Sequence, residues 1–188
     1  MHRTLTALAL PLLLATTAQA EEFTQKGKHE HGKVTLNVAL EGGVLAAEIE
    51  APAINVIGFE HAPRDAAQRK VVADAGAWLS SGARILGVPA SAGCRLTTAK
   101  LEPPAWEEPE AAGKHDHDHE HEHEGEAGHA DYRVSLRYTC SKPAGLAWVE
   151  PWALRGLRDV AELTVNIVTP TVQKSVTATR ADERIALR

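Results

Sequence analysis

The sequence predicts a β-rich α+β fold, with a mainly antiparallel sheet, one main helix and a long disordered histidine-rich loop. Three observations lead to this prediction. Several short segments alternate apolar and polar residues, the period of a half-buried strand, and one segment repeats its apolar residues at helical spacing. A low-complexity stretch rich in histidine and acids interrupts the second half of the chain. With 188 residues, 44% of them hydrophobic, the chain is long enough for one domain with its own core.

The alternation is clearest in the first predicted hairpin. Valine and leucine take every second position in Lys33–Leu40, Glu41-Gly42-Gly43 is a turn signal, and Val44–Glu50 is the returning strand. Further strands are expected at residues 147–152, 163–168 and 172–179, the last two as a closing pair.

The main helix is predicted over Arg64–Leu79. Pro63 can open it, Asp65 lies in its first turn, and the segment 80–82, Ser-Ser-Gly, stops it. The apolar run Ile54–Phe59 is interrupted by glycine and is expected as a short packed loop. A short helical turn is expected within residues 152–160.

The chain has two cysteines, Cys94 and Cys140, and a disulfide between them is the expected state in an exported protein. Two free thiols that act as metal ligands are the alternative. If Cys94–Leu101 pairs antiparallel with Asp131–Cys140 and the cysteines face each other, the register follows. Leu96 then faces Tyr138 and Thr98 faces Leu136, so the apolar positions share one face with the disulfide.

The first twenty residues have the features of a secretory signal peptide. A short basic region precedes the apolar run Leu5–Leu14, and Ala18-Gln19-Ala20 is a small-x-small cleavage site. The run is half as long as the ~20 residues of a spanning helix, and no later segment is apolar enough for membrane insertion after signal cleavage. We expect residues 1–20 to be removed and residues 21–188 to form a single metal-binding domain in the periplasm.

The formal charge of −5 is concentrated in one segment. Residues Glu107–Glu126 contain nine acids and one lysine, a net charge of −8, which leaves +2 on the rest of a mature chain whose total is −6. This segment belongs to an insertion, residues 103–128, that offers only Trp106 to a core and is expected to be disordered without a ligand. A local acidic block favours a cation site or a disordered segment, and nothing indicates a nucleic-acid partner.

The strongest chemical signal is the tract His115–Glu124, in which five histidines alternate with five acids. Imidazole is a ligand for zinc, nickel and copper and is largely deprotonated near neutral pH, while carboxylates add oxygen ligands and attract the cation. In an extended chain every second side chain points the same way, so neighbouring histidines can share an ion. The candidate ligands are His115, Asp116, His117, Asp118, His119, Glu120, His121, Glu122 and His123.

A second candidate site lies outside the tract. His29 and His31 stand two residues apart before the first strand, and His61 follows Glu60 before the helix. Taken alone, the first pair fits a surface loop and His61 fits a packed or capping histidine. Considered together with the tract, they fit a structured three-histidine site completed by Glu60 or a tract histidine. Three histidines with an open fourth position are a known zinc arrangement. His129 is either a further ligand at the base of the tract or simply exposed.

These signals favour a non-catalytic zinc-binding protein of the periplasm. Binding or storage of Ni²⁺ or Cu²⁺ is the first alternative; copper(I) is disfavoured because the only methionine, Met1, is lost with the signal peptide. A metal-dependent hydrolase is disfavoured because the chain has neither His-Glu-x-x-His nor Gly-x-Ser-x-Gly. A partner-binding module with an incidental metal tract is the last alternative.

The sequence also resembles a known family. The segments His29-Glu-His-Gly32, Ala51-Pro-Ala53, Gly58-Phe-Glu-His-Ala-Pro63, Ala92-Gly-Cys94 and Tyr138-Thr-Cys140, with the tract between the cysteines, are similar to the zinc-regulated periplasmic zinc-binding proteins of the ZrgA type. The resemblance implies a role in zinc acquisition and homeostasis, with possible hand-over of Zn²⁺ to a zinc ABC importer. It implies His29, His31, Glu60 and His61 as the fixed ligand positions and the tract as the variable, ligand-rich part.

Overall fold

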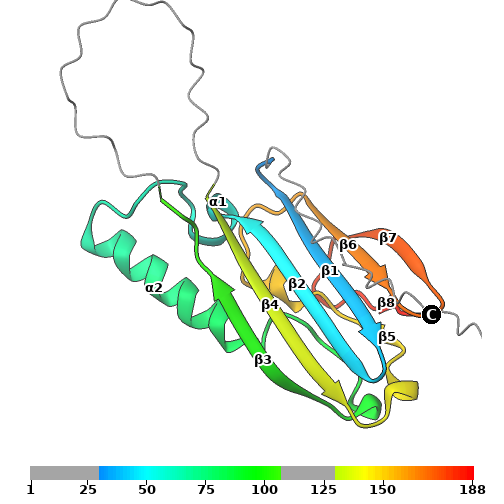
Figure 1. Ribbon diagram of the computed structural model, residues 1–188. Helices are drawn as coiled ribbons and strands as arrows, with labels where there is room; N and C mark the ends of the chain where they lie inside the picture. Colours follow the sequence, from blue (N-terminus) through cyan, green and yellow to red (C-terminus); the bar gives the residue numbers. More distant parts are fainter. Residues whose placement is uncertain (1–29, 107–129) are drawn as a thin grey trace, which may run out of the picture.

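The computed structural model describes residues 30–106 and 130–188 (Figure 1). In chain order its elements are β1 (Lys33–Glu41), β2 (Val44–Pro52), α1 (Ala53–Ile57), α2 (Ala66–Ser81), η1 (Ala90–Ala92), β3 (Cys94–Glu102), β4 (Asp131–Cys140), η2 (Pro143–Gly145), β5 (Trp148–Val149), η3 (Trp152–Arg155), β6 (Glu162–Val168), β7 (Gln173–Ala178) and β8 (Ile185–Ala186). No helix within the two described ranges is long and apolar enough to cross a membrane.

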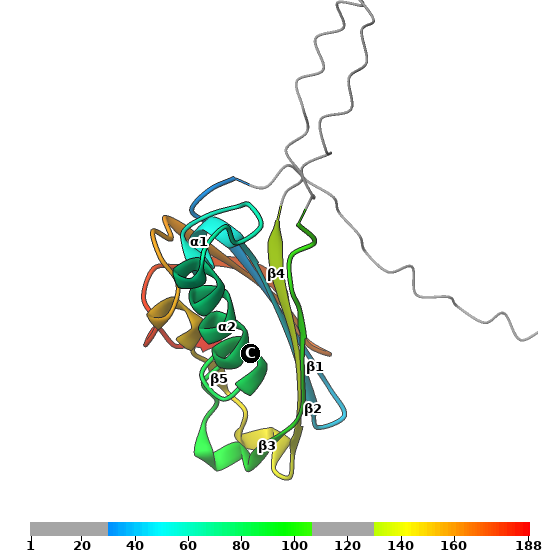
Figure 2. The ribbon, with the colours of Figure 1, turned by 90° about the vertical axis from the view of Figure 1, so that its left-hand side faces the viewer.

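Six strands form one sheet in the order β3-β4-β2-β1-β6-β7. Its strand pairs are antiparallel except for β1 and β6, which run parallel, and β5 and β8 form a separate two-stranded ribbon. Figure 2 shows the helices and the small ribbon on one face of the sheet, with the opposite face uncovered by described elements. The predicted β-rich α+β class with a mainly antiparallel sheet and one main helix is confirmed.

The core lies between the sheet and the helical layer because each strand points alternate side chains into it. In β1, Val34, Leu36 and Val38 are at most 2% exposed, and in β6 Leu163 and Ile167 are fully buried. Burial of each such side chain contributes roughly 1.5–3 kcal/mol. The intervening residues face the uncovered side and are mostly polar, as the predicted alternation requires; Ala39 and Val168, the latter 51% exposed, are the apolar exceptions.

The predicted first hairpin and closing strand pair are both confirmed. β1 and β2 pair from Thr35–Glu50 to Glu41–Val44, and β6 pairs antiparallel with β7. The predicted strand at 147–152 is reduced to the two residues of β5, and the predicted helical turn within 152–160 is η3. β5 ends at Val149, Glu150 forms an isolated bridge with Gly87, and Pro151 is the N-cap of η3.

The predicted main helix is confirmed with shifted ends. Asp65 is the N-cap of α2 rather than a first-turn residue. Its side chain accepts a hydrogen bond from the Gln68 backbone N–H, a group that has no acceptor within the helix. The packed loop predicted for Ile54–Phe59 is wrong, because that segment forms α1, whose C-cap Gly58 has φ 89°. Burial of Ala53, Val56 and Ile57 stabilises this single turn despite its shortness.

The second hairpin and its disulfide are also confirmed. Cys94 and Cys140 are bonded and face each other, and Leu96 faces Tyr138 as predicted. Beyond Leu96 the predicted register is wrong: Thr98 faces Arg137, and Ala99 takes the place opposite Leu136.

A bulge at Thr97 causes this one-residue shift. The Thr97 hydroxyl donates a hydrogen bond to the Arg137 carbonyl at 2.9 Å. The extra residue returns Ala99 and Leu101 to the covered face that Leu96 occupies earlier in β3, so both halves of the strand pack against the core cluster.

Several predictions fall on residues outside the described ranges. These are the signal peptide (1–20), His29, residues 107–128 of the insertion with the tract His115–Glu124, and His129. The first residues assigned to the insertion, 103–106, are described and lie on the folded body. Pro104 is buried, and Trp106 packs against the core cluster.

Candidate metal centre

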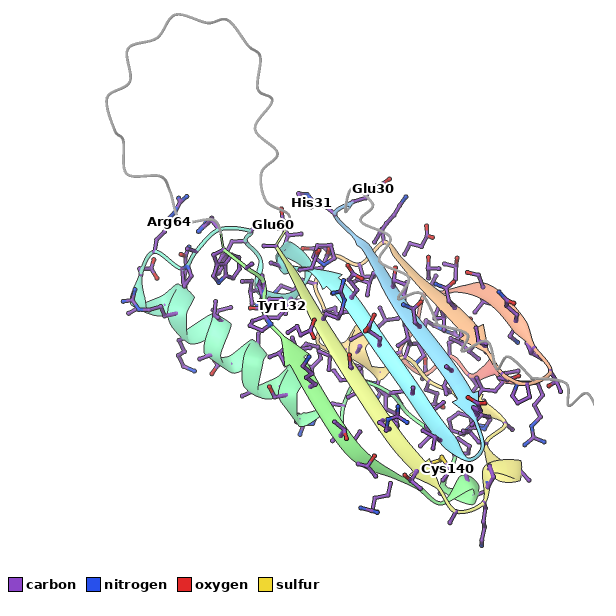
Figure 3. The ribbon with its side chains drawn as sticks, viewed as in Figure 1. Glu30, His31, Glu60, Arg64, Tyr132 and Cys140 are labelled. Atoms are coloured by element: carbon purple, nitrogen blue, oxygen red, sulfur yellow. A yellow bond between two sulfur atoms is a disulfide. The ribbon has the colours of Figure 1, made fainter. Side chains whose placement is uncertain are left out.

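One end of the main sheet gathers the described candidate ligands. There β1 begins and β2 ends. β3 also ends there and β4 begins, since Pro52 faces Asp131 and Glu102 faces Arg133. His31 lies two residues before β1, and Glu60 and His61 follow α1, which leaves the end of β2. Figure 3 shows His31, Glu60 and Glu30 together at this end.

The same end holds the two described residues that flank residues 107–129, the segment that contains the histidine tract. Trp106 precedes residues 107–129 and Ala130 follows them. Ala130 is 2% exposed and its carbonyl accepts a hydrogen bond from the Ala53 N–H of α1 at 2.7 Å. The two described residues on either side of 107–129 therefore lie beside the elements that carry Glu60 and His61.

His31 and Glu60 are in direct contact although 29 positions separate them. The His31 Nε2 atom lies 2.8 Å from Glu60 Oε2, and the side chains are 68% and 29% exposed. Since a carboxylate only accepts, Nε2–H donates, and in the neutral ring the lone pair is on Nδ1. Imidazole and carboxylate are both zinc ligands, and a carboxylate that holds an imidazole is also the usual partner of a zinc-bound histidine.

His61 is held separately. Its Nδ1–H donates a hydrogen bond to the Ala62 carbonyl at 2.9 Å, which leaves the lone pair of the neutral ring on Nε2. The ring stacks on Phe59 with centroids 5.0 Å apart, and Phe59 in turn stacks near Trp106 at 6.5 Å. These contacts fix the ring plane and the tautomer, as a metal-binding histidine needs.

Asn55 connects the two segments that bring His31 and Glu60 together. It is 2% exposed, and its Oδ1 accepts a hydrogen bond from the Gly32 N–H at 3.0 Å. Its Nδ2 donates to the carbonyls of Arg158 and Asp159 at 2.8 and 3.2 Å. Its backbone carbonyl also accepts from the Arg158 N–H at 2.7 Å. One buried amide thus ties α1 to the turn after His31 and to the loop before β6.

Gly32 completes this turn. Its φ is 82°, and a Cβ there would lie 3.2 Å from the Asp159 carbonyl oxygen, so a side chain would be strained and crowded. Its own carbonyl accepts from the Ala161 and Glu162 N–H groups at 2.8 and 3.0 Å. The turn is therefore clamped on both sides, which holds the His31 backbone at the sheet end.

The sequence interpretation missed Asn55. A signal was present, since Asn55 is the one polar side chain in the apolar run from Ile54 to Ile57. A polar group within a buried run must find hydrogen-bond partners, and such a residue is a candidate for fixing a loop.

Comparison of the chain with known protein families gives a match that includes this sheet end. A family profile described as ZrgA family zinc uptake protein matches residues 28–187. The chain belongs to the ZrgA family of zinc uptake proteins. The predicted resemblance is confirmed, and the match includes both the His31 turn and the loop with Glu60. No curated protein matches the chain.

The donors that the ZrgA-family chain shows here suit zinc but do not complete a site. Within residues 30–106 and 130–188, no group of three or more His, Cys, Asp or Glu side chains is placed to hold one ion. The structure brings His31 and Glu60 together. His61 follows Glu60 in the same loop, but its ring bonds the Ala62 carbonyl instead. A four-coordinate ion on this pair would need further donors.

The two cysteines take no part in the candidate centre. They form the disulfide at the start of β3 and the end of β4, the end of the hairpin opposite Glu102 and Asp131. Figure 3 shows Cys140 at the far end of the sheet from His31. The alternative that the thiols are metal ligands is therefore wrong.

Proposed function

We propose that this chain is a non-catalytic zinc-binding protein of the periplasm that acts in zinc acquisition and homeostasis. The observation that supports it most is the 2.8 Å contact between His31 and Glu60 at the sheet end that also holds Trp106 and Ala130. Membership of a zinc uptake family supports zinc as the bound metal.

The proposal divides the work between two sets of ligands. The histidines and acids of the tract capture ions, because they offer many donors at high negative charge. His29, His31, Glu60 and His61 hold one ion at the body, with a tract residue or His129 as an added donor. The high exposure of His31 supports exchange between the two sets.

Export supports the same assignment. We propose that residues 1–20 are a cleaved signal peptide and that residues 21–188 are one metal-binding domain, with residues 103–128 an insertion in it. The disulfide between Cys94 and Cys140 is consistent with an oxidising compartment. We propose that reversible binding serves to hand zinc over to an ABC importer.

Zinc titration by calorimetry tests the division of labour. Three proteins are compared: residues 21–188, the same chain without residues 107–128, and His31→Ala/Glu60→Gln/His61→Ala. The deletion should lower the number of bound ions and leave one site, and the triple variant should remove that site. Loss of all binding on deletion would rule out a site on the body, and an unchanged number of ions would rule out capture by the tract.

Nickel or copper binding remains the main competing function, because imidazole-rich sites accept both metals. Competition of Zn²⁺ against Ni²⁺ and Cu²⁺ on the deletion variant decides between them at the body site. The proposal expects the site to keep zinc against nickel. For the variant that contains Glu60→Gln, the matched control is Glu162→Gln. It changes a carboxylate near the same turn without altering His31 or Glu60.

A further inference from the structure

A second concave site lies on the helical side of the sheet, built from two stretches far apart in the sequence. Trp78 in the last turn of α2 and Arg84 just after it meet Trp152, Arg155 and Gly156 of η3 and its cap. Together they line a cavity of about 500 Å³. That volume is in the range of about 300–1,000 Å³ typical of small-molecule sites.

Both indoles of this pocket rest on glycine. A Cβ at Gly156 would lie 2.4 Å from the Trp78 ring, and a Cβ at Gly87 would lie 2.4 Å from the Trp152 ring. Trp152 is also fixed by its Nε1–H, which donates to Glu150 Oε2 at 2.8 Å. The walls are therefore held in place by backbone and a hydrogen bond, so the pocket is preformed.

The pocket is cationic as well as aromatic. Arg84 and Arg155 are exposed, and within the described part of the chain neither forms an ion pair, whereas Arg133 and Arg184 each have carboxylate partners. The Arg155 guanidinium lies 5.4 Å from the Trp152 ring centroid, so one cation is already placed over an indole wall.

We propose that this pocket binds a small organic carboxylate with a flat apolar body. A guanidinium donates two parallel N–H groups to a carboxylate, a geometry that a single cation on a flexible stem does not offer. Indole walls take up a flat apolar group by burying its faces. Two guanidinium groups without carboxylate partners among the described residues, beside two fixed indoles, select a ligand that carries both features.

The charge of the body supports an anionic ligand. The net +2 outside the acidic segment means that the rest of the mature chain as a whole does not repel an acid. The site does not rest on the proposed zinc function, since its lining contains no histidine, cysteine or carboxylate that could hold zinc.

The test uses the metal-free mature chain and three probes: 2-naphthoate, its neutral amide 2-naphthamide, and acetate. Calorimetry should show naphthoate binding at least about tenfold more tightly than either other probe, because only naphthoate offers both the charge and the flat body. Equal binding of the amide would overturn the role of the arginines, and equal binding of acetate would overturn the role of the indoles. Absence of naphthoate binding up to about 10 mM would overturn the site itself.

Two double variants of equal charge change locate the binding. Arg84→Ala/Arg155→Ala should weaken naphthoate binding at least about tenfold. Arg95→Ala/Arg137→Ala, which removes two exposed arginines from β3 and β4, should leave it unchanged. All four side chains are exposed, so both variants should fold, and thermal unfolding checks this. Equal losses in the two variants would show that naphthoate binds through general charge and not in this pocket.

Discussion

Replacement of Asn55 by aspartate should destabilise the protein in a pH-dependent way. Asn55→Asp keeps the oxygen that accepts from the Gly32 N–H but replaces Nδ2 with an oxygen that faces the Arg158 and Asp159 carbonyls. At neutral pH the new carboxylate is buried, since Asn55 is 2% exposed, and lies against two acceptors.

The magnitude follows from the hydrogen bonds lost. Two carbonyls lose their shared donor, and each unsatisfied polar group costs about 1–3 kcal/mol, so the free energy of unfolding should fall by at least about 2 kcal/mol at pH 7. Burial and the facing carbonyls raise the pKa of the introduced carboxyl in the folded state. Protonation of the new carboxyl restores a donor. The loss of unfolding free energy should therefore shrink as the pH falls toward about 4, because the folded form binds this proton at a higher pH than the unfolded chain.

Urea unfolding of Asn55→Asp and of the parent at several pH values measures this difference. The matched control is Asn166→Asp, whose parent amide is half-buried and donates to Asn37 in a solvent-exposed hydrogen bond on the uncovered face of the sheet. The control should cost less than about 0.5 kcal/mol at every pH. A deficit for Asn55→Asp that is equally small, or that does not change with pH, would refute the assigned role of the buried amide.

Zinc affinity of the body site should fall in the Asn55→Ala variant even where the protein remains folded, because Gly32 and hence His31 lose their anchor; calorimetry at low temperature measures it, and unchanged affinity would contradict the positioning role. Zinc affinity of the parent should fall between about pH 7 and 5 as histidines protonate, and retention at pH 5 would point to carboxylate ligands alone. Reduction of the disulfide should cost about 4 kcal/mol for its 46-residue separation but leave zinc affinity nearly unchanged, because Cys94 and Cys140 lie at the far end of the hairpin. Burial raises the pKa of Tyr138 to about 12, so the folded state resists ionisation and stability is lost as the pH rises above the unfolded value of about 10; Tyr138→Phe should move the midpoint of alkaline unfolding upward.

The elements with strong local periodicity were predictable from sequence. β1, β2, β4 and α2 each carry a clear apolar period, and the disulfide followed from two cysteines in a chain predicted to be exported. The ends of β1 and β4 were predicted to within one residue, because Lys33, Asp131 and the Gly42-Gly43 turn mark them.

Features that depend on distant contacts were not predictable. The parallel pairing of β1 with β6 joins segments more than 120 residues apart, and no local pattern specifies it. α1 is too short for its period to be recognised and is stabilised by burial. The bulge in β3 left a weak trace, because the apolar positions change from even (Leu96) to odd (Ala99, Leu101) along the strand.

The candidate site shows the same division. Residue types predicted His31, Glu60 and His61 as ligands, and the structure places His31 against Glu60. The sequence could not show that His61 turns toward the Ala62 carbonyl and Phe59 instead of toward that pair. It also could not show that Asn55 spans more than 100 residues to hold the turn.

The exposure of His31 supports the proposed transfer of zinc to a partner. A structural zinc site closes four ligands around the ion, and release then requires several bonds to break before any acceptor can approach. In the proposed site the His31 side chain is 68% exposed, so a partner can approach the ion and add its own ligands before His31 and Glu60 release it. The ion need never be bare, which lowers the barrier to exchange. If the body site were instead closed and buried when loaded, zinc release to a chelator would be independent of chelator concentration; the proposed open site predicts a rate that rises with it.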